Sequence, residues 1–173
     1  YLQEAKGKID RLPLANWHFV GAIQSNKTKE IANQFNWVHS VDSERLAKRL
    51  SEQRDPKKGK LNIFIQVNTT KEPQKRGVHP DDVYALARKI SEFSNISFAG
   101  LMTIPAQSHN EYIASSCFRN LRQISEQISC RLCLEKNLHL SMGMSNDYLS
   151  AIKEGSTWVR IGTMIFGPRD KRP

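Results

Sequence analysis

The chain has 173 residues, which fits one domain that can bury a sizeable hydrophobic core. Its apolar runs fall short of the roughly 18 residues that a membrane-spanning helix needs, and we see no signal peptide. The formal net charge of +9 favours acidic partners in general, and three cysteines cannot all pair, so we expect a reducing cytoplasm.

Helix-like and strand-like segments alternate along the chain. Apolar side chains three and four positions apart predict helices, as at Leu46 and Leu50. Short apolar runs between turn signals predict strands. The predicted helices cover residues 1–11, 27–35, 43–53, 81–93 and 111–136, and the predicted strands cover residues 17–21, 37–42, 61–68 and 97–104. This alternation is typical of α/β proteins with a parallel sheet.

Two more predicted strands, joined by a short helix, follow towards the C-terminus. They cover residues 139–144 and 158–162. Ser145 is suited to cap the N-terminus of the helix, and Gly155 is suited to end it. A helix between two strands indicates that they run parallel, because a hairpin needs no helix. We therefore predict six parallel strands in all.

The last two strands are polar on one face. In the strand over residues 158–162, Arg160 and Gly162 share a face with Trp158, because side chains alternate along a strand. In the preceding strand, Ser141 lies opposite the face of the methionines. A buried parallel sheet is normally apolar on both faces. These residues therefore leave space, hydrogen-bond donors and one fixed positive charge.

Hydroxyl and backbone N–H groups gather at the carboxyl ends of the same two strands. Ser145 follows one strand, and Gly162 and Thr163 stand at the end of the other. Ligands of α/β folds bind at this edge of a sheet, often through a phosphate at a helix N-terminus. We therefore expect a ligand site at this edge.

Other polar residues are open to two interpretations. Arg160, taken alone, is equally well explained as a paired structural arginine. Gln66 and Asn68 alternate with apolar residues, which predicts that they face the interior, where they line a site or form a buried polar network. His18 and His39 either line the pocket or are core histidines with satisfied hydrogen bonds, and we favour the second interpretation.

Two further patterns have simple explanations. The pair Cys130-x-x-Cys133 has a zinc-like spacing, but without a second pair it favours structural cysteines. Basic clusters in predicted loops, at residues 57–60, 71–76 and 169–172, lack interleaved aromatic residues. This pattern favours solvated loops over a nucleic-acid interface.

Five sequence motifs follow one another along nearly the whole chain. They are WHFVGAIQSNK (Trp17–Lys27), HSVDS (His39–Ser43), IQVNTTKEPQKRG (Ile65–Gly77), GLMTIPA (Gly100–Ala106), and LSMGMSNDYLSAIKEGST with the VRIGT that follows it. In this order they resemble the YggS/PROSC family of pyridoxal phosphate (PLP) homeostasis proteins. Chance matches to five ordered motifs are improbable.

The resemblance implies a fold. Members of that family are (β/α)8 TIM barrels of the alanine racemase N-terminal type. It implies a single PLP-binding barrel domain over residues 1–173, incomplete with six of eight β-α units, so that about 60 residues are absent at the N-terminus. The family's Schiff-base lysine lies on the first barrel strand, and no lysine of this chain matches that position. The exposed sheet edges of such a truncated barrel favour self-association.

The resemblance also implies a cofactor site. Arg160 is expected to face the pyridine nitrogen of PLP, with Ser141 beside it as an orienting residue. A guanidinium only donates hydrogen bonds, so the ring nitrogen stays unprotonated and is a poorer electron sink. Ser145, Gly162 and Thr163 are expected to hold the phosphate.

The resemblance implies a cytoplasmic PLP-binding protein of vitamin B6 homeostasis, a non-catalytic carrier that hands PLP to apo-enzymes. One alternative is a PLP-dependent amino-acid racemase or decarboxylase. Related enzymes join their barrel to a β-rich domain, and here the sequence ends at GPRDKRP directly after the last motif, so we expect no enzyme activity. A less favoured alternative is a basic nucleic-acid-binding protein.

Overall fold

Six parallel strands form one curled sheet whose strand order follows the chain. The computed structural model describes residues 2–70, 72, 74–105 and 111–168. Each strand pairs in parallel with the next. The strands are β1 (His18–Phe19), β2 (Trp37–Val41), β3 (Leu61–Gln66), β4 (Ile96–Met102), β5 (His139–Met144) and β6 (Trp158–Arg160). The predicted α/β class and its six parallel strands are confirmed.

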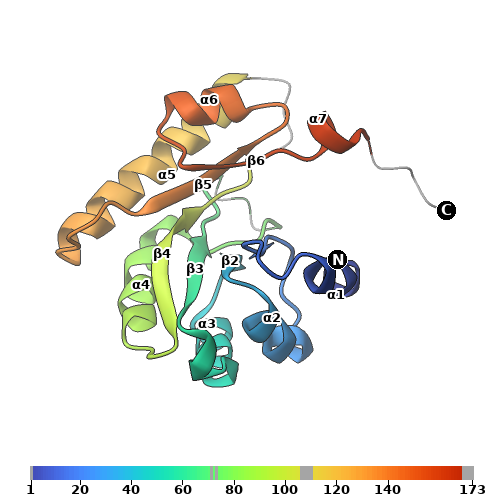
Figure 1. The fold of residues 1–173 in the computed structure, drawn as a ribbon. Coiled ribbons are helices and arrows are strands. Elements are labelled where there is room, and N and C mark those ends of the chain that lie inside the picture. The colour runs from blue at the N-terminus through green and yellow to red at the C-terminus, as the bar shows by residue number, and fades with distance from the viewer. Residues whose placement is uncertain (1, 71, 73, 106–110, 169–173) are drawn as a thin grey trace.

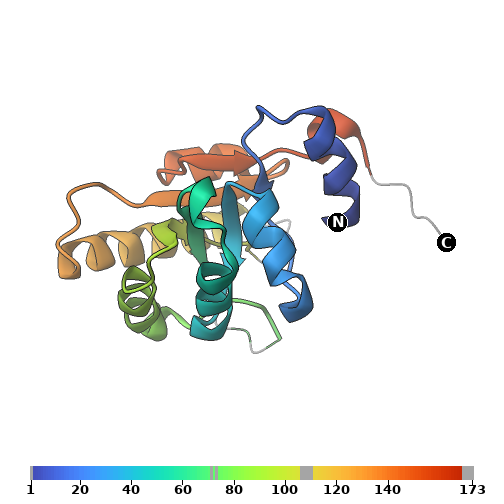
Figure 2. The ribbon, with the colours of Figure 1, turned by 60° about the horizontal axis from the view of Figure 1, so that its bottom comes forward.

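Helices connect the strands, and most of them follow the outside of the curve (Figure 1). They are α1 (Leu2–Arg11), α2 (Thr28–Gln34), α3 (Glu44–Gln53), α4 (Val83–Ser91), α5 (Glu111–Arg131), α6 (Tyr148–Lys153) and α7 (Thr163–Phe166), with short 3-10 turns at Ser25–Lys27, Pro56–Lys58 and Pro80–Asp82. Figure 2 shows α2, α3 and α4 side by side along one face of the sheet. No helix of the described ranges has the length and apolar character needed to cross a membrane.

The main hydrophobic core lies between the sheet and these outer helices. Ile63 and Ile65 of β3 are fully buried in it, together with Leu50 of α3 and Phe118 of α5. Phe64, between the two isoleucines, is also fully buried but stands outside this cluster. Because side chains alternate along a strand, Phe64 lies on the opposite, concave face of the sheet. The outer face of β3 is therefore apolar, and its concave face carries Asn62, Phe64 and Gln66.

Local sequence signals set several element ends. The Ser43 hydroxyl caps α3 by accepting a hydrogen bond from the Leu46 N–H at 3.4 Å. Gly155 ends α6 as predicted, with a φ of +89° and its N–H on the Ile152 carbonyl at 3.0 Å. The strand β5 has the predicted bounds, residues 139–144.

Several element ends differ from the prediction, and β1, β3 and β4 all end earlier than predicted. The strand β6 ends at Arg160, because Gly162 already has a right-handed helical backbone and is the N-cap of α7. The helix α5 ends at Arg131, where a tight turn begins, rather than at residue 136. Ser145 does not cap α6, whose N-cap is Asp147. The four-residue helix α7 was not predicted, since it is too short to show a periodic pattern.

Candidate functional site

Arg160 ends β6, and its side chain is half-buried. Its Nη1 donates to the Ser141 Oγ at 2.9 Å, and its Nη2 donates to the Thr103 carbonyl oxygen at 3.0 Å. Burial lowers the pKa of Arg160 to about 10, against the opposing effect of the Asp147 charge. The side chain is thus still protonated at neutral pH. The predicted pairing of Arg160 with Ser141 is confirmed.

The two acceptors of Arg160 are both neutral. None of the ion pairs among the described residues includes Arg160. The interpretation of Arg160 as an ion-paired structural arginine is therefore wrong within this part of the chain. A half-buried cation that has neutral hydrogen-bond acceptors, with Asp147 acting on it only through its charge, favours a further anion or a strong hydrogen-bond acceptor.

A line of hydrogen bonds continues from Ser141 across the concave face. The Ser141 Oγ lies 2.7 Å from the His39 Nδ1, and the His39 Nε2 lies 2.9 Å from the His18 Nδ1. Ser141 is fully buried and His39 is 2% exposed. The prediction of a hydrogen-bonded core histidine is confirmed for His39, whereas His18 is hydrogen-bonded but only half-buried, and both are connected to Arg160.

Aromatic rings enclose the two histidines. The His18 ring stacks on Trp37 with centroids 5.4 Å apart, and the His39 ring stacks on Phe64 at 4.3 Å. Burial, helped by the charges of His18 and Arg160, lowers the pKa of His39 to about 3. Burial also lowers the pKa of His18. The structure therefore favours neutral imidazoles at neutral pH.

Ser145 joins the ends of β5 and β6. Its Oγ accepts hydrogen bonds from the N–H groups of Gly162 and Met164, both at 3.3 Å. The predicted cap of the helix after β5 is therefore wrong, because the Ser145 hydroxyl bonds N–H groups at the start of α7 instead. Thr163 begins α7 and is exposed. The structure thus brings together Ser145, Gly162 and Thr163, and it places Ser141 against Arg160 on the same two strands.

Gln66 and Asn68 hold a loop. Gln66 is 8% exposed, and its Nε2 donates to the Arg76 carbonyl at 3.5 Å. Asn68 follows the end of β3, and its Nδ2 donates to the Glu72 carbonyl at 2.7 Å. Asn68 is half-buried beyond the end of β3 and anchors the following loop, so its predicted interior position stays a prediction.

The cysteine pair is not part of the core. Cys130 and Cys133 are both exposed, whereas Cys117 is buried. The expectation of structural cysteines is wrong for this pair, because it lies where α5 ends and the chain turns with a φ of +49° at Cys133. Nor does the described part of the chain hold a group of three candidate metal ligands.

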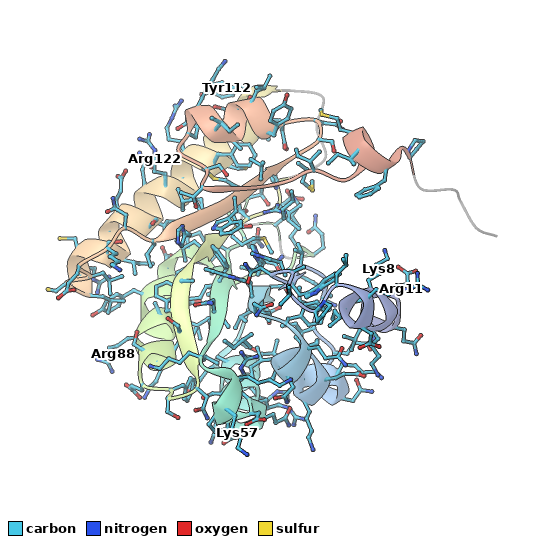
Figure 3. The ribbon with its side chains drawn as sticks, in the orientation of Figure 1. Lys8, Arg11, Lys57, Arg88, Tyr112 and Arg122 are labelled. Atoms are coloured by element: carbon cyan, nitrogen blue, oxygen red, sulfur yellow. The ribbon has the colours of Figure 1, made fainter. Side chains whose placement is uncertain are left out.

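Basic residues are spread over separate elements. Figure 3 shows Lys57 pointing outward from the turn after α3 and Arg88 pointing outward from α4, whereas Arg122 of α5 pairs with Glu154 at 3.3 Å. Lys75, in one predicted basic cluster, pairs with Glu72 at 2.6 Å. The predicted cluster at residues 169–172 lies outside the described residues. This distribution is consistent with solvated positive charge.

A separate concave pocket of about 640 Å³ lies between α1 and the end of α2. None of the five predicted site residues lines it. Arg54, one of its lining residues, donates to the carbonyl oxygens of Phe35, at 2.9 Å, and Gly59, also at 2.9 Å. These bonds complete the end of α2 and the turn after α3, so Arg54 is explained by the fold itself.

The fold and this arrangement define a class. The chain belongs to the alanine racemase N-terminal domain family, whose model matches residues 1–170. Within that class it groups with the pyridoxal phosphate homeostasis proteins. It is 48% identical to the protein of that name from Pseudomonas aeruginosa, over 98% of this chain and 73% of that protein. The predicted family is confirmed.

Solved structures agree with this grouping. PipY of Synechococcus elongatus, without PLP, matches 96% of this chain and 79% of its own, with 33% identity and a TM-score of 0.89. The structure of PipY with PLP bound gives 32% identity and a TM-score of 0.86. Alanine racemase from Corynebacterium glutamicum, 14% identical with a TM-score of 0.75, shares the fold. The predicted barrel-type fold is confirmed.

Proposed function

We propose that this chain binds PLP in PLP homeostasis and acts as a non-catalytic carrier. The single observation that carries the proposal is the half-buried Arg160 guanidinium at the ligand-binding edge of the sheet, whose acceptors within the described residues are both neutral. The name of the Pseudomonas relative and the PLP-bound structure of PipY support the choice of ligand.

The donor set fits the two ends of the PLP molecule. Arg160 only donates hydrogen bonds, so it suits a ring nitrogen that is unprotonated. At the strand ends, the Gly162 and Met164 N–H groups converge on the Ser145 hydroxyl, and open space surrounds the Cα of Gly162. A phosphate oxygen would accept from these N–H groups in place of the Ser145 oxygen, and the Ser145 hydroxyl would donate to the phosphate. We assign Thr163 to the same phosphate site.

The chemistry of the site favours holding PLP over reacting it. PLP, when bound, supplies an electron sink whose strength depends on a protonated ring nitrogen. Arg160 carries a fixed positive charge and has no proton to yield at neutral pH, so it keeps that nitrogen as an acceptor. Ser141 and Thr103 hold the guanidinium in place. These residues therefore favour binding and orientation without strong carbanion stabilisation.

The finer parts of the proposal concern setting and partners. We assign the carrier to the cytoplasm and take apo PLP-dependent enzymes as its recipients. We further propose self-association through the sheet edges, since β1 and β6 each have one strand neighbour in the described sheet.

The experiment is a PLP titration of the protein, followed by fluorescence and equilibrium dialysis, beside an alanine racemisation assay. We expect saturable, non-covalent binding at a single site and no turnover above the rate given by free PLP. Faster turnover would show that the protein is an enzyme and not a non-catalytic carrier. A lack of saturable binding would remove PLP as the ligand.

A further inference from the structure

The direction of every hydrogen bond in the line from Arg160 to His18 follows from one fixed donor. The guanidinium of Arg160 has N–H groups and no lone pair, so it can only donate to Ser141. The Ser141 oxygen is therefore the acceptor in that bond. Its single hydroxyl proton must be used on its other side.

His39 is the acceptor for that proton. The Ser141 Oγ has two hydrogen-bond partners within the described residues, the Arg160 Nη1 and the His39 Nδ1. Because Arg160 cannot accept, the hydroxyl proton points to the His39 Nδ1 at 2.7 Å. The Nδ1 of His39 is then unprotonated. A neutral His39 therefore carries its proton on Nε2.

The same reasoning determines the tautomer of His18. The His39 Nε2–H donates to the His18 Nδ1 at 2.9 Å, so that His18 nitrogen is also unprotonated. A neutral His18 carries its proton on Nε2 as well. The stacking of His18 on Trp37, with ring planes 1° apart, holds the His18 ring in this orientation.

The opposite direction leaves a buried group unsatisfied. If the His39 Nδ1–H donated to Ser141, the hydroxyl proton of Ser141 would have no acceptor among the described residues. Such a buried donor is destabilising, and Ser141 is fully buried. A doubly protonated His39 would fail in the same way and would add a second charge beside Arg160, which agrees with its lowered pKa.

We propose that His39 and His18 are positioning residues for Arg160, joined to it by a one-way hydrogen-bond line, Arg160 to Ser141 to His39 to His18. Because His39 takes the hydroxyl proton, Ser141 presents only lone pairs to the guanidinium. The guanidinium of Arg160 is thereby held in one orientation. The effect of these residues on PLP binding rests on the proposed function, whereas the donor and acceptor roles in the hydrogen-bond line do not.

The first test needs no PLP. Long-range ¹H–¹⁵N NMR on the ¹⁵N-histidine-labelled protein at pH 7 distinguishes the two neutral tautomers and the imidazolium. We expect His39 and His18 to be neutral with the proton on Nε2. A proton on the Nδ1 of His39, or a charged His39, would overturn the proposal even if PLP binds. The expected tautomers without PLP binding would overturn the proposed function alone.

A second test uses two substitutions that differ in one property. His39→Asn keeps an acceptor oxygen for the Ser141 hydroxyl, and His39→Leu does not. With Arg160 held through Ser141, we expect PLP affinity to fall about tenfold in His39→Leu and to stay within about threefold in His39→Asn. The exposed His79→Asn is the control. Equal affinities for the Leu and Asn variants would contradict a role through hydrogen bonding.

Ser141→Ala keeps the test decisive if a His39 variant fails to fold. This substitution removes one hydroxyl and leaves no polar group in its place. We expect the Nε2–H preference of His39 to weaken and the side-chain N–H signals of Arg160 to broaden. An unchanged His39 tautomer with sharp, unshifted Arg160 signals would show that Ser141 does not connect the two residues.

Discussion

Thr103 and Arg160 stand 57 positions apart in the chain and meet at the end of the sheet, where the Arg160 Nη2 donates to the Thr103 carbonyl at 3.0 Å. Thr103 is itself fixed, because its Oγ1 donates to the Val67 carbonyl at 3.0 Å and its N–H bonds the Ser141 carbonyl at 3.2 Å. The guanidinium is therefore tied to the ends of β4 and β5. This attachment turns a flexible side chain into a fixed donor.

Replacing Arg160 should weaken PLP binding strongly. A hydrogen bond to a charged group contributes about 1.5–3 kcal/mol, so Arg160→Ala should raise the Kd for PLP by about 10- to 100-fold. Arg160→Lys should recover part of the loss, because lysine keeps the charge but not the two fixed donor directions. Fluorescence titration measures both. Lys57 points outward, so Lys57→Ala is the matched control. If Arg160→Ala bound PLP as tightly as Lys57→Ala, Arg160 would not be part of the site.

Acid should destabilise the protein through His39. Its pKa is about 3 in the folded chain and near 6.5 when unfolded, so the unfolded chain binds more protons between these values. The contribution of His39 is present above pH 6.5 and is lost as the pH falls towards 3. Between pH 7 and pH 5 it amounts to about 2 kcal/mol.

The matching measurement is chemical denaturation at pH 7 and pH 5. The His39→Asn variant lacks the titrating ring, so its free energy of unfolding should change less between the two pH values than that of the parent protein. His79→Asn, at an exposed position, should behave like the parent. The same pH dependence in all three proteins would mean that His39 is not held neutral.

The three cysteines should differ in reactivity. Cys130 and Cys133 are exposed and Cys117 is buried. A thiol reagent such as DTNB should therefore modify two thiols quickly in the folded protein and the third only on unfolding. Mass spectrometry after brief maleimide treatment assigns the sites. Fast labelling of Cys117 would contradict this prediction and would show that α5 opens without unfolding of the whole protein.

Two glycines should respond to alanine in opposite ways. Gly155 has a φ of +89°, so Gly155→Ala should destabilise by about 1 kcal/mol. Gly7 lies within α1 with open space around it, so Gly7→Ala should stabilise by about 0.5–1 kcal/mol. Thermal unfolding of both variants measures the difference. A stabilising Gly155→Ala would show that the turn after α6 tolerates another backbone conformation.

Signals close together in the sequence predicted much of the fold. The alternating pattern of β5 sets its bounds at residues 139–144, and the helix-ending role of Gly155 needs only its own backbone conformation. Strand alternation also placed Arg160 and Ser141 on one face, where they form a hydrogen bond. Each of these predictions depends on residues that are close together within a single helix or strand.

Contacts between distant elements could not be predicted in this way. His39 and Ser141 are 102 positions apart, and nothing in the residues around either one indicates its partner. Ser145 has the side chain of a helix cap, but which helix it caps depends on how β6 brings Gly162 beside it. The predicted capping of α6 is wrong, because Ser145 is near α6 in the sequence but bonds the start of α7 in the structure.

The position of Arg160 against the PLP ring is tested most directly by ¹⁵N NMR of PLP labelled at its ring nitrogen and bound to the protein at pH 7. We predict the chemical shift of an unprotonated pyridine nitrogen that accepts a hydrogen bond, and a loss of that hydrogen bond in Arg160→Ala. A protonated ring nitrogen, or a chemical shift that Arg160→Ala leaves unchanged, would contradict the assignment of Arg160 to the ring nitrogen.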